Sequence, residues 1–256
     1  SAPKYQGRYM SIATFVVNLD ADTERLGETR RQLQAAGVEF TRIAAVNGKQ
    51  VEKTCAQPAL EQAGRQLTCG EVGCFLSHRL AAQAFLDSDA EIGLVLEDDL
   101  AVQPHAKATL DALARDWRRQ SIWDIANLAR PAKHRFTQLP ASQWTGPKPI
   151  FRAHYMPVTT AAIAWTRGGA TEFLLRTQTF GLPVDVFIQR WVAETNRGLA
   201  MLEPPFASRD DDSTIGYDGR RRQPPFSRAS RQRFKRLLRN HAAAARNEKE
   251  TRKRAK

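Results

Sequence analysis

The sequence has few cysteines and no long apolar run. Its 256 residues include three cysteines, Cys55, Cys69 and Cys74. This number is too small for a disulfide framework, and it is odd, which favours a reducing compartment. No apolar stretch reaches the length that crosses a bilayer, and the first residues lack the apolar segment of a secretory signal. We therefore expect a soluble, cytoplasmic protein.

Acidic residues are nearly missing from the C-terminal end. The net charge of +12 resembles that of a nucleic-acid-binding protein. Residues 219–256, however, hold 15 Lys and Arg against two Glu, whereas residues 1–218 hold 24 basic and 25 acidic groups. Nucleic-acid binding would need basic residues interleaved with aromatics, and the tail has only Phe226 and Phe234. We predict a neutral domain at residues 10–218, a basic tail at 219–256, and no nucleic-acid partner.

Hydrophobic patterns indicate an α/β domain. An apolar run at residues 13–19 is typical of a buried strand, a helical stretch follows it, and a second strand is expected to end at Asn47. A strand, a helix and a strand in this order imply a parallel sheet with helices on its faces. Further strands are predicted at residues 92–100, 123–129, 159–166 and 199–205, and further helices at residues 68–88, 168–178 and 183–195. Residues 130–155 are predicted to form a long irregular loop.

The strand predicted at residues 92–100 reads IGLVLEDDL and ends in three adjacent carboxylates. Like charges this close repel and raise one another's pKa, so a neutralising partner is expected. Because side chains alternate along an extended chain, Glu97 and Asp99 should project to one side and Asp98 to the other. Two carboxylates on one side suit Mg²⁺ or Mn²⁺, which keep open positions for phosphate oxygens. We predict a metal site at Glu97 and Asp99; the alternative is an acidic strand end that caps the next helix.

Several segments carry a family resemblance. FVVNLDADTERL, FTRIAAVNGK, LTCGEVGCFLSH and LVLEDDL, in this order and spacing, resemble glycosyltransferase family 25, the group of lipooligosaccharide and lipopolysaccharide core galactosyltransferases with relatives that glycosylate collagen. The resemblance extends more loosely to about residues 12–216. It implies a GT-A-like (Rossmann-like) fold, a UDP-galactose donor, a divalent metal and inversion at the anomeric carbon. It also makes Glu97 and Asp99 the counterpart of the DxD motif. Leu26 departs from the Arg that family members tend to have there.

Polar residues at the ends of the first two predicted strands are candidates for binding the donor. Asn18 and Asp20 lie where a nucleotide base or ribose would sit beyond the first strand, and Arg25 is one turn into the following helix. Asn47 ends the second strand. Asp20 could equally serve only as a helix cap, worth about 1 kcal/mol.

The helix predicted from residue 68 carries further donor candidates. A Thr-x-x-Glu capping box places Glu71 in its first turn, and the missing side chain of Gly70 lets a ligand approach backbone amides that favour anions. The family motif includes the Gly-Glu and Ser-His pairs, so the resemblance places Ser77 and His78 near the donor as well. A buried, hydrogen-bonded histidine is the alternative for His78. A zinc site on His78 and Cys74 lacks the further ligands that such sites need.

A carboxylate is also needed to activate the acceptor. Inverting glycosyl transfer requires a base that takes the proton from the attacking hydroxyl, and Asp185, in the first turn of a predicted helix, is the first candidate. The helix dipole alone also favours an acid there. The acids at residues 210–212 are rivals for this role. Asp98 and Ser213 complete the predicted donor contacts.

The tail contains FKRLLRNHAAAAR, which predicts a basic amphipathic helix. Its less polar residues can share one face: Phe234, Leu237, Leu238, His241, Ala242 and Ala245. Such a helix suits attachment to an anionic bilayer, and the alternative is a solvated, partly disordered tail. Attachment would fit a glycolipid acceptor and a peripheral location on the inner face of the bacterial inner membrane.

These patterns converge on one hypothesis. The protein is expected to move galactose from UDP-galactose to a lipooligosaccharide- or lipopolysaccharide-type acceptor, with inversion and with Mn²⁺ or Mg²⁺. A UDP-glucose-dependent transferase of the same family is the nearest alternative. A basic-tailed nucleic-acid-binding protein and a non-catalytic partner protein are alternatives of a different class.

Overall fold

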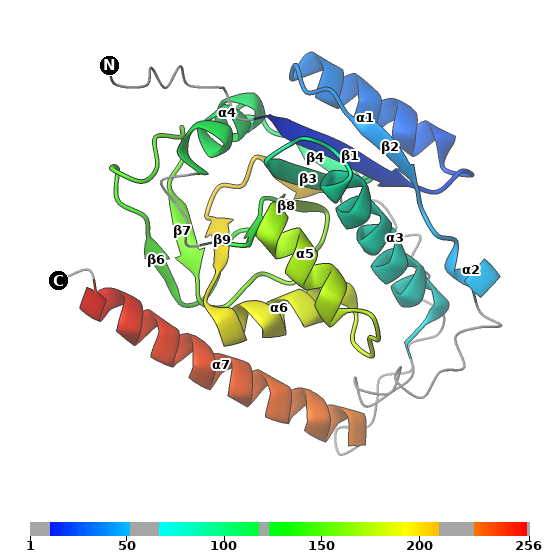
Figure 1. The fold of residues 1–256 in the computed structure, drawn as a ribbon. Coiled ribbons are helices and arrows are strands. Elements are labelled where there is room, and N and C mark those ends of the chain that lie inside the picture. Colours follow the sequence, from blue (N-terminus) through cyan, green and yellow to red (C-terminus); the bar gives the residue numbers. More distant parts are fainter. Residues whose placement is uncertain (1–10, 52–66, 118–122, 210–227, 255–256) are drawn as a thin grey trace, which may run out of the picture.

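The computed structural model describes residues 11–51, 67–117, 123–209 and 228–254. An eight-stranded sheet in the order β2-β1-β3-β8-β5-β9-β7-β6 forms the centre (Figure 1). Its strands are β1 Ile12–Asn18, β2 Thr41–Ala44, β3 Ile92–Glu97, β5 Ile125–Asn127, β6 Phe136–Gln138, β7 Ile150–Ala153, β8 Ala162–Thr166 and β9 Gly198–Met201. A second, two-stranded antiparallel sheet joins β4 (Leu100–Val102) to β10 (Phe206–Ser208).

The large sheet is mixed. β1 runs parallel to β2 and β3, and β5 runs parallel to β9. β8 is antiparallel to both β3 and β5, and β7 is antiparallel to both β9 and β6. Six of the eight strands therefore point the same way. The predicted GT-A-like α/β fold, with a mainly parallel sheet covered by helices and a helical tail, is confirmed in this arrangement.

The long loop predicted at residues 130–155 is wrong in part. This segment contains the two short strands β6 and β7, which extend the sheet at its edge. The strands have three and four residues, and Pro140, Pro147 and Pro149 lie between them. Such short runs beside prolines show too little alternation to be recognised from the sequence.

Helices cover both faces of the sheet. They are α1 Thr23–Ala35, α2 Gly48–Val51, α3 Cys69–Leu86, α4 Ala106–Asp116, α5 Arg167–Arg176, α6 Val184–Thr195 and α7 Arg228–Arg254. Successive residues of β1 face opposite ways: Val16 joins a core with α1 and α4, whereas Phe15 and Val17 join a second core with α3, α5 and α6. Both cores are apolar, so the sheet is buried on both sides.

Glycines allow the start of α3 to press against the segment that follows β2. A Cβ added to Gly73 would lie 2.6 Å from the Val46 carbonyl oxygen and 2.8 Å from the Gly48 backbone nitrogen. Both contacts are with backbone, so Gly73→Ala should lower the free energy of unfolding by about 1–3 kcal/mol, as overpacking does. Gly27, in α1, has nothing within 4 Å of such a Cβ. Gly27→Ala is therefore the control, and it should stabilise by up to about 1 kcal/mol in the same urea titrations. Equal stability of Gly73→Ala and wild type would contradict the close approach.

The tail helix α7 packs on the domain rather than extending from it (Figure 1). Asn247 donates to the Ala193 carbonyl of α6 at 2.9 Å, and Arg135 pairs with Glu248 at 3.1 Å. Ala244 is fully buried. No helix within the described ranges is both long and apolar enough to cross a membrane.

The apolar face predicted for this helix is divided. Leu237 and His241 are half-buried, and the His241 ring stacks on Tyr155 with 4.3 Å between ring centroids. Phe234 and Leu238 are 62% and 56% exposed. The predicted apolar face does not pack as one surface, because α7 contacts the domain along a stripe that includes Asn240 and Ala244. The sequence of a helix alone does not show the shape of the surface on which the helix packs.

Candidate active site

The acidic triplet lies where β3 ends. β3 stops at Glu97, and Asp98 and Asp99 form the turn before β4. The alternation expected for an extended chain therefore does not continue beyond Glu97. Each of the three carboxyls meets different neighbours.

Glu97 is held by two hydrogen-bond donors. Its Oε1 lies 3.1 Å from His78 Nε2 of α3 and accepts from the Thr160 hydroxyl at 2.6 Å. Burial raises the pKa of Glu97, but the bonds from His78 and Thr160 outweigh burial and leave that pKa below its usual value. Glu97 is therefore a carboxylate at neutral pH. Thr160 reaches it from the segment before β8, which pairs with β3.

Cys74 completes a small cluster with His78 and Glu97. One potential ligand atom from each residue lies within 4.8 Å of the others. Burial, followed by the charge of Glu97, raises the pKa of the Cys74 thiol well above its usual value. The protonated thiol does not suit the hard cations Mg²⁺ and Mn²⁺, which take oxygen ligands. His78 Nδ1 is buried and has no hydrogen-bond partner among the described residues. Glu97 is thus a third member of the cluster that begins with Cys74 and His78. The sequence alone does not indicate this third member.

The side chain of Asp98 contacts both the end of β1 and the first helix, α1. Its Oδ2 accepts from the Asn18 amide at 2.6 Å, and its Oδ1 lies 3.6 Å from the Arg25 guanidinium. Burial raises the pKa of Asp98, and Asn18 and Arg25 oppose that rise. Arg42, on β2, donates to the Asn18 side chain at 2.9 Å. The structure thus brings together three of the residues predicted to bind the nucleotide-sugar donor, and it adds Arg42. The only signal for it in the sequence is a cation within a predicted strand beside the first.

Asp99 has a buried oxygen, Oδ1, with no hydrogen-bond partner among the described residues. Burial raises the pKa of Asp99 to about 6, with further contributions from the charges of Glu97 and Asp98. A carboxylate that has one oxygen buried without a hydrogen-bond donor, and that two neighbouring acids repel, is a group that a cation would stabilise. The residues present therefore fit a divalent metal at Asp99.

Asp185 lies in the first turn of α6, and its Oδ1 accepts from the Val186 backbone amide at 2.7 Å. Burial raises the pKa of Asp185, and the charges of Glu97 and Glu71 raise it further. Glu71, Glu97 and Asp185 therefore come from α3, β3 and α6 to one region. Acids that converge in this way, with a raised pKa at Asp185, are typical of a catalytic site.

Sequence comparison identifies the family of this chain. Residues 11–188 match the family model described as "Glycosyltransferase family 25 (LPS biosynthesis protein)". The chain belongs to glycosyltransferase family 25. The resemblance noted in the sequence is thereby confirmed.

The family 25 relatives include proteins named as galactosyltransferases. The chain is 29% identical over 186 residues to procollagen galactosyltransferase 1-B of Xenopus laevis, covering 68% of this chain and 30% of that protein. It is 28% identical over 198 residues to procollagen galactosyltransferase 1 of Danio rerio, covering 73% and 32%. The chain thus spans about a third of the length of these relatives. A solved glycosyltransferase involved in glycosylation of the major capsid of PBCV-1 aligns with 91% of the chain and 98% of its own, with a TM-score of 0.43 and 11% identity.

Two residues of this family 25 chain that are predicted to bind the nucleotide-sugar donor have local structural roles. The Ser77 hydroxyl accepts from the Val46 amide at 2.8 Å and donates to the Gly73 carbonyl at 2.7 Å, which ties α3 to the segment after β2. Asn47 is exposed and accepts from the Lys49 amide at 3.0 Å at the start of α2.

Two further predicted residues, Gly70 and Glu71, lie in the first turn of α3. Glu71 forms the predicted capping box with Thr68. Asp20 is exposed and pairs with Arg42, while the residue that precedes α1 is Asp22. Ser213 and its acidic neighbours at 210–212 lie outside the described residues.

Proposed function

We propose that this chain transfers galactose from UDP-galactose to a hydroxyl of an acceptor glycan, with inversion and with Mn²⁺ or Mg²⁺. The observation that carries the proposal is the Oδ1 atom of Asp99, which is buried without a hydrogen-bond partner among the described residues and lies just after Glu97 and the end of β3. Nucleotide ligands bind beyond the carboxyl ends of parallel strands, and the family 25 relatives named above are galactosyltransferases.

The donor side of the site is assigned to the first two strands and the acidic turn. Asp99 and Glu97 would hold the cation, which when bound would neutralise charge on the departing diphosphate. Asn18, Arg25 and Asp98, already linked by hydrogen bonds and an ion pair, bind the nucleotide and ribose. His78 and Thr160 keep Glu97 ionised and oriented.

Asp185 is assigned as the base. Burial keeps its pKa above the ordinary aspartate value, which brings it nearer to the working pH and makes proton transfer more efficient. Asp185 takes the proton of the acceptor hydroxyl as that oxygen bonds to the anomeric carbon. The bond from the anomeric carbon to the diphosphate oxygen breaks at the same time, and UDP leaves from the opposite face.

UDP release from a panel of UDP-sugars tests this function. Many transferases slowly hydrolyse their donor, so the assay is run without acceptor, with and without Mn²⁺. Mn²⁺-dependent release from UDP-galactose, with slower release from UDP-glucose, is the expected result. Release from UDP-glucose alone would reassign the donor, and no binding or turnover of any UDP-sugar would overturn the transferase assignment.

We further propose that the exposed side of α7 attaches the enzyme to an anionic bilayer, on the cytoplasmic face of the inner membrane, where a lipooligosaccharide-type acceptor would be presented. Phe234 and Leu238 are four residues apart and exposed. Exposed basic residues share this side of the helix: Arg231, Lys235, Arg239, Arg246 and Lys249. Apolar anchors among cations favour an anionic lipid surface.

Co-sedimentation with vesicles tests this attachment. The wild-type chain should bind phosphatidylglycerol vesicles, bind phosphatidylcholine vesicles weakly, and lose binding as salt is added. The double variant Phe234→Ser, Leu238→Ser should bind several-fold less. Leu175→Ser on α5 changes another exposed leucine, 59% exposed, and should bind as the wild type. Equal binding of the double variant and wild type would refute the assignment.

A further inference from the structure

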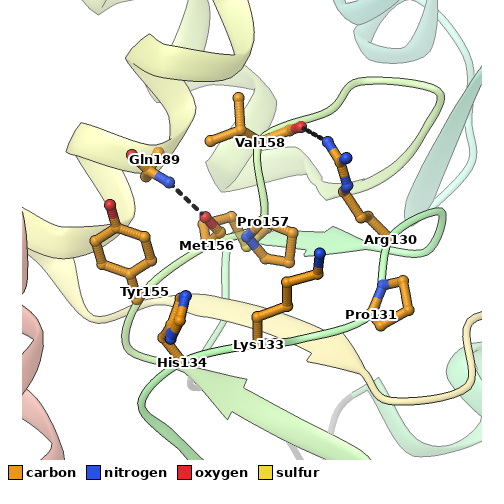
Figure 2. A pocket seen from close by; sticks show the side chains of 9 residues that line it. All are labelled: Arg130, Pro131, Lys133, His134, Tyr155, Met156, Pro157, Val158 and Gln189. Atoms are coloured by element: carbon orange, nitrogen blue, oxygen red, sulfur yellow. Dashed lines mark hydrogen bonds between the residues drawn. The ribbon is translucent and has the colours of Figure 1, made fainter.

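A pocket opens between the segments that follow β5 and precede β8. Its walls are residues 130–134 and 155–158, and Gln189 of α6 closes one side (Figure 2). Arg130, Lys133 and His134 contribute basic side chains, and no Asp or Glu is among the residues that line the pocket. This one-sided composition favours an anionic occupant.

Among the residues that the structure describes, no acid forms an ion pair with Arg130 or Lys133. Arg130 donates to the Val158 carbonyl at 2.8 Å, and Lys133 has no ion pair within the part of the chain that the structure describes. Figure 2 shows both side chains reaching from the β5 side toward the opposite wall. Both residues are exposed, so an incoming anion would meet them without first displacing a carboxylate.

Less polar groups form another part of the pocket. Tyr155 and Met156 are buried, and Pro131 and Pro157 lie beside them. The Tyr155 ring is held by His241 of α7, with 4.3 Å between ring centroids. A few placed polar groups next to an apolar surface are typical of small-molecule sites. Together they suit a sugar ring that carries a charged substituent.

The walls of the pocket are connected to the carboxyl cluster, which comprises Glu71, Glu97 and Asp185. The connections run through α6 and through the segment before β8. Gln189 lies one turn after Asp185 on α6 and donates to the Met156 carbonyl at 2.9 Å. The opposite wall continues from Val158 to Thr160, whose hydroxyl bonds Glu97. Arg236 of α7 interacts electrostatically with both Asp185 and Tyr155. A group in the pocket would therefore lie on the same side of the molecule as the assigned base.

We infer that this pocket binds an anionic substituent, a phosphate monoester or a carboxylate, of the acceptor glycan. The inference rests on the proposed function, because it names the class of acceptor that the transferase would use. Phosphate and carboxylate share the negative charge and oxygen acceptors that Arg130 and Lys133 recognise. Neutral glycans also have oxygen acceptors, but they lack the negative charge and would bind more weakly.

Binding of small sugars to the full chain, measured by amide NMR without any nucleotide donor, tests the inference. Glucose 6-phosphate and glucuronate represent the two anions, and glucose is the neutral comparison. At least one anionic sugar should shift the amide signals of the non-proline residues in 130–134 and 155–158 at concentrations where glucose does not. Whichever sugar binds identifies the substituent, and binding of both indicates recognition of charge.

Two variants make the test specific. Arg130→Ala with Lys133→Ala should weaken binding of the anionic sugar at least tenfold, whereas Lys107→Ala on α4, an exposed lysine paired with Asp111, should bind as the wild type. Equal shifts with glucose, or unchanged binding by the double variant, would overturn the inference. UDP release by the wild type is measured separately. Absence of that release would refute the proposed transferase, and loss of anion selectivity alone would refute only the pocket assignment.

Discussion

Asp185→Asn is expected to slow sugar transfer by about 10²–10⁴-fold, the usual contribution of a general base, with little change in the affinity for UDP-galactose. Asparagine keeps the shape of the side chain and can still accept the 2.7 Å bond from the Val186 amide, but it cannot take a proton. Single-turnover transfer and equilibrium binding of the donor measure the two quantities. Because burial raises the pKa of Asp185, wild-type activity should fall with decreasing pH at a point above the ordinary aspartate pKa.

The control separates catalysis from helix electrostatics. Glu24 also lies in the first turn of a helix, α1, so Glu24→Gln removes a favourable dipole interaction of about 0.3–1 kcal/mol without touching the carboxyl cluster. It should be slightly less stable and fully active. Wild-type transfer rates in Asp185→Asn would show that Asp185 only stabilises its helix, and the acids at 210–212 would then be the next to substitute.

The sequence predicts the members of this site better than their arrangement. The run of apolar residues before Glu97 correctly predicts a buried strand, and the Thr-x-x-Glu pattern correctly predicts the capping box at Glu71. The expected alternation beyond Glu97 fails because the strand ends there and the chain turns. A strand boundary depends on pairing, and β4 pairs with β10, more than 100 residues away.

Contacts between residues far apart in the chain also could not be predicted from the sequence. Thr160 bonds Glu97 across 63 residues because β8 inserts antiparallel beside β3, and no local pattern predicts that insertion in a mainly parallel sheet. For α7, the sequence predicts a basic amphipathic helix, but the docking stripe is decided by α6 and β6. That stripe is what places Arg236 near Asp185.

Asp99→Asn is expected to stabilise the metal-free protein at pH 7.5 and to abolish metal-dependent UDP release. The pKa of Asp99 is about 6 in the folded chain, above the unfolded value, so the folded state binds this proton more tightly. The ionised side chain therefore lowers the free energy of unfolding above pH 6, by at most about 3 kcal/mol and by less where solvent screens the charge. Asparagine removes that cost. Urea titrations between pH 4 and 8 should show the advantage of the variant shrinking toward low pH.

Glu97→Gln is the matched control, because the sign of its effect is opposite. Hydrogen bonds from His78 and Thr160 hold the pKa of Glu97 below its usual value, so its ionised form stabilises the fold at neutral pH, and that contribution is lost as pH falls through the folded pKa. Glu97→Gln should therefore destabilise the protein at pH 7.5, where Asp99→Asn stabilises it. If both variants lost stability, Asp99 would have a donor in the fold and its place in the metal site would be wrong.

Manganese separates the two roles further. Mn²⁺ should raise the melting temperature of the wild type, since a ligand that binds only the folded state stabilises it, and it should leave Asp99→Asn unchanged. The two carboxyls are two residues apart and are both assigned to the cation, but they would then have opposite effects on the stability of the metal-free protein. Glu97 contributes to stability through His78 and Thr160, whereas Asp99 is kept in an unfavourable state that a cation relieves. If Asp99→Asn gains stability and loses activity, then the unfavourable charge of Asp99 in the metal-free protein is the feature that serves the reaction.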